Sequence, residues 1–109
     1  MELLWYFLAG FFTWNSIPHL VPGIMGQTHM TPFKRVSSPM LNVVWGFINL
    51  IIGLYVLGIA AGTGGFALPW DAGLTGSNFW AYLAGAIAVA ITAAWLFGRP
   101  NARLPWHKD

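Results

Sequence analysis

Three long apolar stretches dominate the hydrophobic pattern of this chain, and shorter, more polar segments separate them. The stretches cover residues 3–24, 40–61 and 79–97. At about 1.5 Å per residue, each is long enough as a helix to cross a hydrocarbon core of about 30 Å. The pattern therefore predicts one all-α domain over residues 1–109, an integral membrane protein with three transmembrane helices and a tail at residues 99–109.

The inner half of the first stretch interrupts its apolar pattern. Pro18 and Pro22 have no N–H to give to the carbonyls four residues earlier. Lipid offers no replacement donor, so a neighbouring helix, a hydroxyl side chain or water must supply one. We therefore expect the first helix to be kinked or broken in its inner half.

The polar segments carry start signals for the other two helices. Ser38 precedes Pro39, a pairing typical of an N-cap followed by the first helical position. Ser77 is the corresponding candidate cap for the third helix. We expect the second loop, residues 62–78, to be an irregular cover because it is rich in glycine.

All five lysines and arginines fall on one side of this three-span arrangement. Lys34 and Arg35 lie between the first and second stretches, and Arg99, Arg103 and Lys108 follow the third. Basic residues collect in the short cytoplasmic segments of membrane proteins. We therefore expect the N-terminus outside and the C-terminus in the cytoplasm, with the protein in a bacterial inner (cytoplasmic) membrane.

Composition agrees with lipid as the main partner. The chain is 57% hydrophobic and only 7% charged, whereas about 25% charged is usual in soluble domains. The side chains of Lys34, Arg35, Arg99 and Arg103 are candidates for contact with lipid headgroups. No basic stripe interleaved with aromatic residues is present, so nucleic acid is not an expected partner. The absence of cysteine excludes disulfides and iron–sulfur ligation.

A polar stripe runs along one face of the second span. It consists of Asn42, Gly46, Asn49 and Gly53, which stand at helical spacing. Asn15 and His19 are four residues apart on the first span and share a face. We expect Asn15, His19, Asn42 and Asn49 to form a polar cluster in the inner half of the bundle. Such a cluster either holds the first two helices together or forms a polar pocket or pathway.

Small residues on two spans indicate close helix packing. Gly46 and Gly53 lie on the second span, and Ala81, Gly85 and Ala88 repeat at helical spacing on the third. Small side chains let another backbone approach closely. The neighbour is either a helix of this chain or a helix of another subunit.

The function classes left open are few. There is no paired carboxylate, no nucleophile beside a base and no phosphate-binding glycine loop, so we expect no enzyme. The leading interpretation is a non-enzymatic component of a membrane assembly, either a homo-oligomer or an accessory subunit of a larger complex. The alternative is a small transporter or channel for an ion or small polar solute.

A cofactor-binding membrane subunit is a minor alternative. His19 is the only group within the spans that titrates near neutral pH, and four residues with soft or imidazole ligands stand near it: Met25, His29, Met30 and Met40. Thioether and imidazole together suit copper, and His19 alone suits haem or chlorophyll if a partner completes the site. The spacing matches no tight ligand motif, so the cofactor stays unassigned.

One run of residues in the first half of the chain resembles a known family. The run comprises Pro18-His19, Gly23, Gly26, Thr31-Pro32-Phe33, Ser38-Pro39, Asn42, Trp45-Gly46 and Asn49. It looks like a family of small, uncharacterised bacterial integral membrane proteins. The resemblance brings no activity, and it implies that the loop between the first two spans and the polar residues flanking it form the distinctive part.

Overall fold

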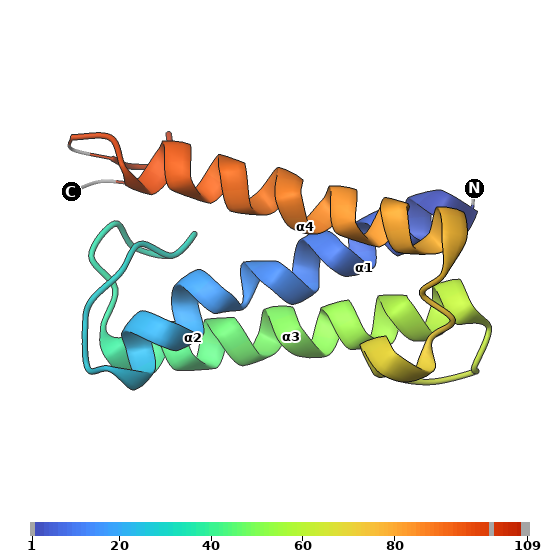
Figure 1. The fold of residues 1–109 in the computed structure, drawn as a ribbon. Helices are drawn as coiled ribbons and strands as arrows, with labels where there is room; N and C mark the ends of the chain where they lie inside the picture. The colour runs from blue at the N-terminus through green and yellow to red at the C-terminus, as the bar shows by residue number, and fades with distance from the viewer. Residues whose placement is uncertain (1, 101, 108–109) are drawn as a thin grey trace.

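The computed structural model describes residues 2–100 and 102–107, and this part of the chain is helical, without strands. The elements, in chain order, are α1 (Glu2–Asn15), α2 (Ile17–Ile24), α3 (Pro39–Ala61), the short 3-10 helix η1 (Pro69–Asp71) and α4 (Gly76–Phe97) (Figure 1). The predicted all-α class is confirmed. Lys108 and Asp109, at the end of the predicted tail, lie outside the described residues.

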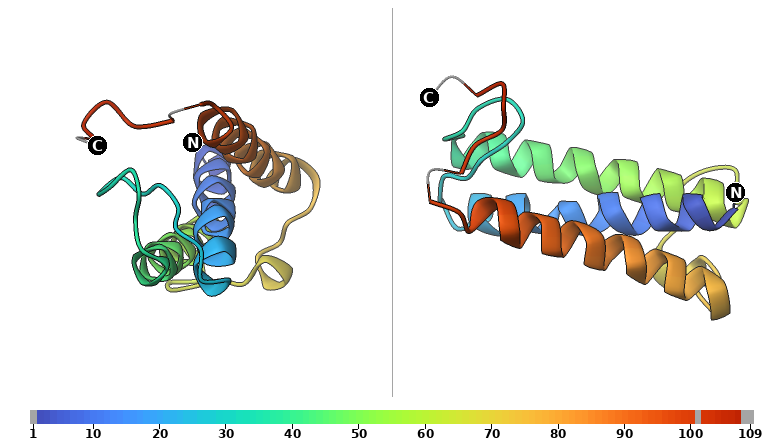
Figure 2. Two further views of the ribbon diagram at one scale, coloured as in Figure 1. Left: turned by 90° about the vertical axis from the view of Figure 1, so that its left-hand side faces the viewer. Right: turned by 90° about the horizontal axis from the view of Figure 1, so that it is seen from above.

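Helix α1 lies between the two long helices. It contacts both α3 and α4, α2 continues along α3, and α3 and α4 contact one another little or not at all (Figure 2). The molecule is elongated, with extents of 42 × 23 × 23 Å. Residues 25–38 and the C-terminal tail share one end, and the N-terminus and residues 62–75 share the other (Figure 1).

Helices α3 and α4 are each long and apolar enough to cross a membrane. Their most apolar windows have mean hydropathies of 2.2 and 1.8, and only 28% and 22% of those windows is buried inside the protein. A core helix of a soluble protein is mostly buried, so these exposed apolar faces favour contact with lipid. Helices α1 and α2, with 14 and 8 residues, are each shorter.

The boundary between α1 and α2 falls at Ser16, where the hydrogen-bond ladder is interrupted. Ser16 keeps a helical backbone, with φ −65° and ψ −32°. Pro18 has no N–H, which leaves a carbonyl of the preceding turn without its usual donor. The Ser16 hydroxyl donates to the Thr13 carbonyl at 2.6 Å, and the Leu20 N–H donates to the Ser16 carbonyl at 2.8 Å. This hydroxyl bond goes to Thr13, whereas the carbonyl that Pro18 leaves without its usual donor is that of Trp14, four residues earlier.

The cap predicted for α3 is confirmed, and the cap predicted for α4 is wrong. The Ser38 hydroxyl accepts a hydrogen bond from the Leu41 N–H at 3.1 Å, with Pro39 opening the helix. Helix α4 begins earlier, after Thr75, whose extended backbone occupies the N-cap position. Ser77 therefore lies inside the first turn. Hydrophobicity placed the start too late because a polar first turn precedes the apolar run.

Glycines mark the closest contacts between the helices. A Cβ on Gly85 of α4 would lie 1.9 Å from the Phe7 carbonyl oxygen of α1, and one on Gly53 of α3 would lie 2.2 Å from the Thr13 hydroxyl. Only glycine permits such an approach. The predicted packing positions Gly46, Gly53 and Gly85 thus face helices of this same chain. Ala81 packs against the core, and Ala88 is half-buried.

The two ends of the molecule have different interiors. The end with the N-terminus has an apolar core, formed by Tyr6, Ala9, Leu57, Ala67, Ala72 and Tyr82. There the Tyr6 hydroxyl donates to the Ala72 carbonyl at 3.2 Å. The opposite end buries polar side chains instead, and these form the candidate site.

Candidate functional site at the polar end

Asn42 is the central residue of the polar end. It is fully buried, and its amide nitrogen faces the carbonyls of His29, Ser37 and Ser38 at 2.9, 3.2 and 3.1 Å. Its Oδ1 lies 3.0 Å from Nδ1 of His19, which is 3% exposed. Since the amide nitrogen donates, Oδ1 accepts, and His19 Nδ1 carries the proton. The Nε2 of a neutral His19 ring is then the free acceptor.

A second polar pair lies farther along the same helices. Asn15 Nδ2 donates to Asn49 Oδ1 at 3.0 Å, and Asn49 Nδ2 donates to the Trp45 carbonyl at 2.9 Å. The four residues of the predicted cluster are thus brought together in two pairs, each joining the first helical stretch to α3. Asn49 is 1% exposed, whereas Asn15 is half-buried.

The loop over residues 25–38 folds back onto Asn42. His29 and Ser37 exchange backbone hydrogen bonds of 3.2 and 3.1 Å. The buried hydroxyls of Thr31 and Ser37 lie 2.7 Å apart. Sequence reasoning missed this compact loop, although the Thr31-Pro32 turn and the hydroxyl at Ser37 were a usable signal.

The C-terminal tail is bound to this loop by three long-range hydrogen bonds. Trp106 Nε1 donates to the Pro32 carbonyl at 2.6 Å, Arg35 Nε donates to the Ala102 carbonyl at 3.0 Å, and His107 Nε2 lies 2.8 Å from the Thr31 carbonyl. His107 Nδ1 accepts from the backbone N–H of Leu104 at 2.9 Å, so its Nε2 is the donor to Thr31. We call residues 25–38 and 102–107 together the loop–tail face.

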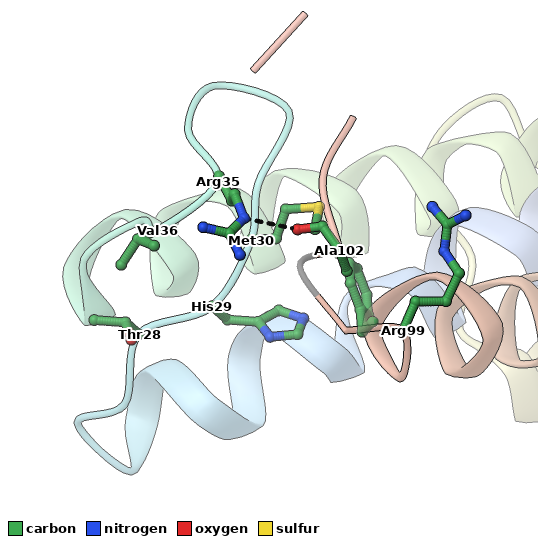
Figure 3. A pocket seen from close by; sticks show the side chains of 8 residues that line it. Thr28, His29, Met30, Arg35, Val36, Arg99 and Ala102 are labelled. Carbon is green, nitrogen blue, oxygen red and sulfur yellow. Dashed lines mark hydrogen bonds between the residues drawn. The ribbon is translucent and has the colours of Figure 1, made fainter. Parts of the chain in front are cut away.

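Two cavities adjoin at the polar end. The inner one, of about 130 Å³, is lined by one residue of each pair, Asn15 and His19, together with aromatic and aliphatic side chains, Trp45 among them. The outer one, of about 310 Å³, is lined by His29, Arg35 and Arg99 among others (Figure 3). Met30 and Phe97 line both cavities.

His29 lines the outer cavity in an unusual setting. Its Nε2 is buried without a hydrogen-bond partner among the described residues. The ring packs edge-on against Phe97, with 4.2 Å between centroids. Burial lowers the pKa of His29, and the nearby His19 lowers it further. The neutral imidazole is therefore favoured here.

Soft and imidazole ligands are close together but few. The rings of His19 and His29 lie 5.4 Å apart, and the buried Met30 follows His29. Met25 and Met40 are 64% and 73% exposed. The described residues contain no group of three or more His, Cys, Asp or Glu side chains placed to hold a metal ion.

The predicted headgroup residues gather at the loop–tail end. Lys34 is exposed, Arg35 binds the tail, and Arg103 donates to the His107 carbonyl. Arg99 stacks over Trp95, with its guanidinium carbon 4.2 Å from the ring centroid. The four basic side chains therefore surround the polar end of the molecule.

Comparison with protein-family models, curated proteins and solved structures finds no match for this chain. The resemblance to a family of small bacterial membrane proteins therefore stays a prediction.

Proposed function

We propose that this protein crosses the membrane three times and acts, without catalysis, as a small component of a membrane assembly. Helices α3 and α4 supply two spans by length and hydropathy. Helices α1 and α2 supply the third, since residues 2–24 follow one line along α3 and measure about 34 Å at 1.5 Å per residue. The breaks in hydrogen bonding at the prolines fall within this span, next to the inner cavity.

The proposed orientation places the loop–tail face in the cytoplasm. Lys34, Arg35, Arg99 and Arg103 all belong to that end, and the positive-inside rule assigns such an end to the cytoplasm. The N-terminus and residues 62–75 then face outward. The long extent of 42 Å agrees with a bilayer of about 40–45 Å including headgroups.

The observation that carries the assembly proposal is the fixed shape of the loop–tail face. Long-range hydrogen bonds, of which the one between His107 and Thr31 is buried, hold it. It nevertheless exposes large side chains: Phe33 is 61% exposed and Trp106 is 62% exposed. Exposed aromatic and basic side chains on a rigid surface are typical of interface hot spots. We propose a larger membrane complex or a second copy of the chain as the partner of this surface.

Cross-linking in native membranes tests this proposal. The chain has no cysteine, so Phe33→Cys introduces a single attachment point on the loop–tail face. Trp80→Cys, at the other end of the molecule and 66% exposed, is the matched control. We expect a cross-linked species of defined higher mass from Phe33→Cys and little from Trp80→Cys. A monomer from both variants, and in native mass spectrometry, would refute the assembly.

A transporter or channel is the second candidate, and the inner cavity is the observation that favours it. Asn15 and His19 line this cavity at the junction of α1 and α2, and free polar atoms at a helix break can bind ions or polar solutes. Flux of small ions into liposomes should then fall in Asn15→Leu and His19→Leu. Absence of flux in the wild-type protein, or unchanged flux in both variants, would reject this candidate.

A further inference from the structure

Two series of hydrogen bonds end at the inner cavity, and each leaves one acceptor free there. In the first, Asn42 Nδ2 faces three backbone carbonyls, so Asn42 Oδ1 accepts from His19 Nδ1. The proton of the neutral imidazole is then on Nδ1, and Nε2 has only a lone pair to offer. The carbonyls around Asn42 therefore fix His19 Nε2 as an acceptor.

The second series fixes Asn15 in the same way. Asn49 Nδ2 donates to the Trp45 carbonyl at 2.9 Å, so Asn49 Oδ1 accepts from Asn15 Nδ2 at 3.0 Å. The remaining atom of the Asn15 amide, Oδ1, receives no hydrogen bond from any described residue. Because this oxygen has lone pairs and no proton, it is a second free acceptor.

Both free acceptors are open to the cavity. Asn15 and His19 line it. Among the described residues, the buried side-chain polar atoms that lack a hydrogen-bond partner are Thr13 Oγ1 and His29 Nε2, so the two free acceptors are not sealed in the same way. Asn15 and His19 are four residues apart on one helical face, where Cβ atoms lie about 5–6 Å apart. One small ligand can therefore contact both acceptors.

The charge of the surroundings disfavours an ion in this cavity. Its described lining has no acidic residue, no lysine and no arginine, and an ion that leaves water for such a wall has a large desolvation cost. The basic side chains at the same end of the molecule add repulsion for a cation: Lys34, Arg35, Arg99 and Arg103. The two free acceptors repel an anion. The cavity is therefore suited to an uncharged molecule that donates hydrogen bonds.

The size of the cavity limits this molecule to a few heavy atoms. The volume is about 130 Å³, which is below the range of about 300–1,000 Å³ that is usual for drug-sized ligands. Since one water occupies about 30 Å³ of the liquid, a molecule of about four heavy atoms fits. The rest of the wall is mainly apolar, with Trp45, Phe97 and Leu104 among its residues. A small molecule with one polar and one apolar end matches this wall.

We propose that the inner cavity binds a small, uncharged molecule that donates hydrogen bonds to His19 Nε2 and Asn15 Oδ1, with a primary amide as the simplest representative. The site rests on the cavity and on the two series of hydrogen bonds. It depends neither on membership of an assembly nor on the flux of ions. A failure of either proposed function would therefore leave the binding site standing.

Four probes of nearly the same shape separate the effect of charge from that of hydrogen bonding. Acetamide is uncharged and donates, acetone is uncharged and does not donate, acetate is an anion, and acetamidinium is a cation that donates. Each probe is titrated into the full chain in micelles at mildly alkaline pH, where imidazoles are neutral. Nitrogen NMR of labelled histidine follows the Nε2 resonance of His19. The chain has three histidines, and the His19 signal is the one lost in His19→Gln.

We expect acetamide to shift the Nε2 resonance until the site is saturated, and acetone and acetate to leave it unchanged. Acetamidinium should bind at least about tenfold more weakly than acetamide. Asn15→Leu should weaken acetamide binding about tenfold, as for the loss of one hydrogen bond. Asn78→Leu is the matched control, because it makes the same change in the first turn of α4, outside the cavity lining. It should leave acetamide binding unchanged.

Three results would overturn the proposal. A shift with acetone or acetate as large as that with acetamide would show that donation of hydrogen bonds is not required. Acetamidinium that binds as tightly as acetamide would remove the restriction to uncharged molecules. No shift with any probe, or equal affinities for acetamide in Asn15→Leu and Asn78→Leu, would overturn the site itself. The comparison of probes uses the wild-type chain, so it decides the matter even if a variant fails to fold.

Discussion

Replacing Asn42 with leucine measures how much the buried hydrogen bond between His19 and Asn42 contributes to stability. Asn42 binds three carbonyls, but each of them keeps another donor. His29 and Ser37 still exchange their backbone hydrogen bonds, and the Ser38 carbonyl still accepts from the backbone N–H of residue 42. The group left unpaired is the Nδ1–H of His19, whose ring is 3% exposed.

The magnitude follows from this inventory. A buried donor without a partner costs about 1–3 kcal/mol, and each lost hydrogen bond to an already bonded carbonyl adds about 0.5–1.5 kcal/mol at most. We therefore expect Asn42→Leu to lower the free energy of unfolding by at least about 2 kcal/mol. Asn49→Leu should cost about 1 kcal/mol or less, because the half-buried Asn15 can find another partner.

Reversible unfolding in mixed micelles, followed by tryptophan fluorescence, measures these differences. The double variant His19→Leu/Asn42→Leu completes the cycle. It removes both partners, so it should be more stable than Asn42→Leu alone. A loss below about 0.5 kcal/mol in Asn42→Leu, or a double variant less stable than both single variants, would refute the pairing of His19 with Asn42.

Three further predictions test other parts of the fold. Gly85→Ala should cost about 1–3 kcal/mol, because its Cβ meets a carbonyl of α1, while Gly65→Ala, with open space around it, should stay within about 0.5 kcal/mol in the same assay. Burial lowers the pKa of His29 below 6.5. Just below that pH, the unfolded chain therefore binds more protons than the folded chain does. Stability should be full above pH 6.5 and fall as the pH drops from there toward the lowered value, and His29→Gln should flatten the profile. His107→Ala should release the tail and speed tryptic cleavage after Arg103 in limited proteolysis, and an unchanged rate would show that His107 does not hold the tail.

The apolar pattern was sufficient to predict the two long helices α3 and α4, because each is one continuous apolar run. The first apolar stretch forms two helices, α1 and α2, and the short helix η1 was not predicted. Ser38 and Pro39 marked the start of α3 for a local reason, the geometry of the cap. The start of α4 was misplaced because its first turn holds Gly76 and the polar residues Ser77 and Asn78, which hydropathy alone assigns to a loop.

The polar end could be predicted only in part. Helical spacing, together with similar depth in the proposed bilayer, predicted that four polar residues lie close together: Asn15, His19, Asn42 and Asn49. Spacing did not predict which of the four residues pair with each other. It also did not predict that the tail binds the loop through Trp106 and Pro32. Both depend on contacts between residues far apart in sequence. Spacing within one helix carries no information about such contacts. The same holds for the outer cavity, which needs the loop, the tail and the end of α4 together.

Cysteine accessibility at the two ends of the molecule tests the proposed topology most directly. Trp70→Cys places a thiol on the side proposed to face outward, where Trp70 is 77% exposed, and Lys34→Cys places one on the loop–tail face. A membrane-impermeant maleimide should label Trp70→Cys in intact spheroplasts and Lys34→Cys only after permeabilisation. Labelling of Lys34→Cys in intact spheroplasts, with Trp70→Cys protected, would contradict the orientation and the placement of the loop–tail face in the cytoplasm.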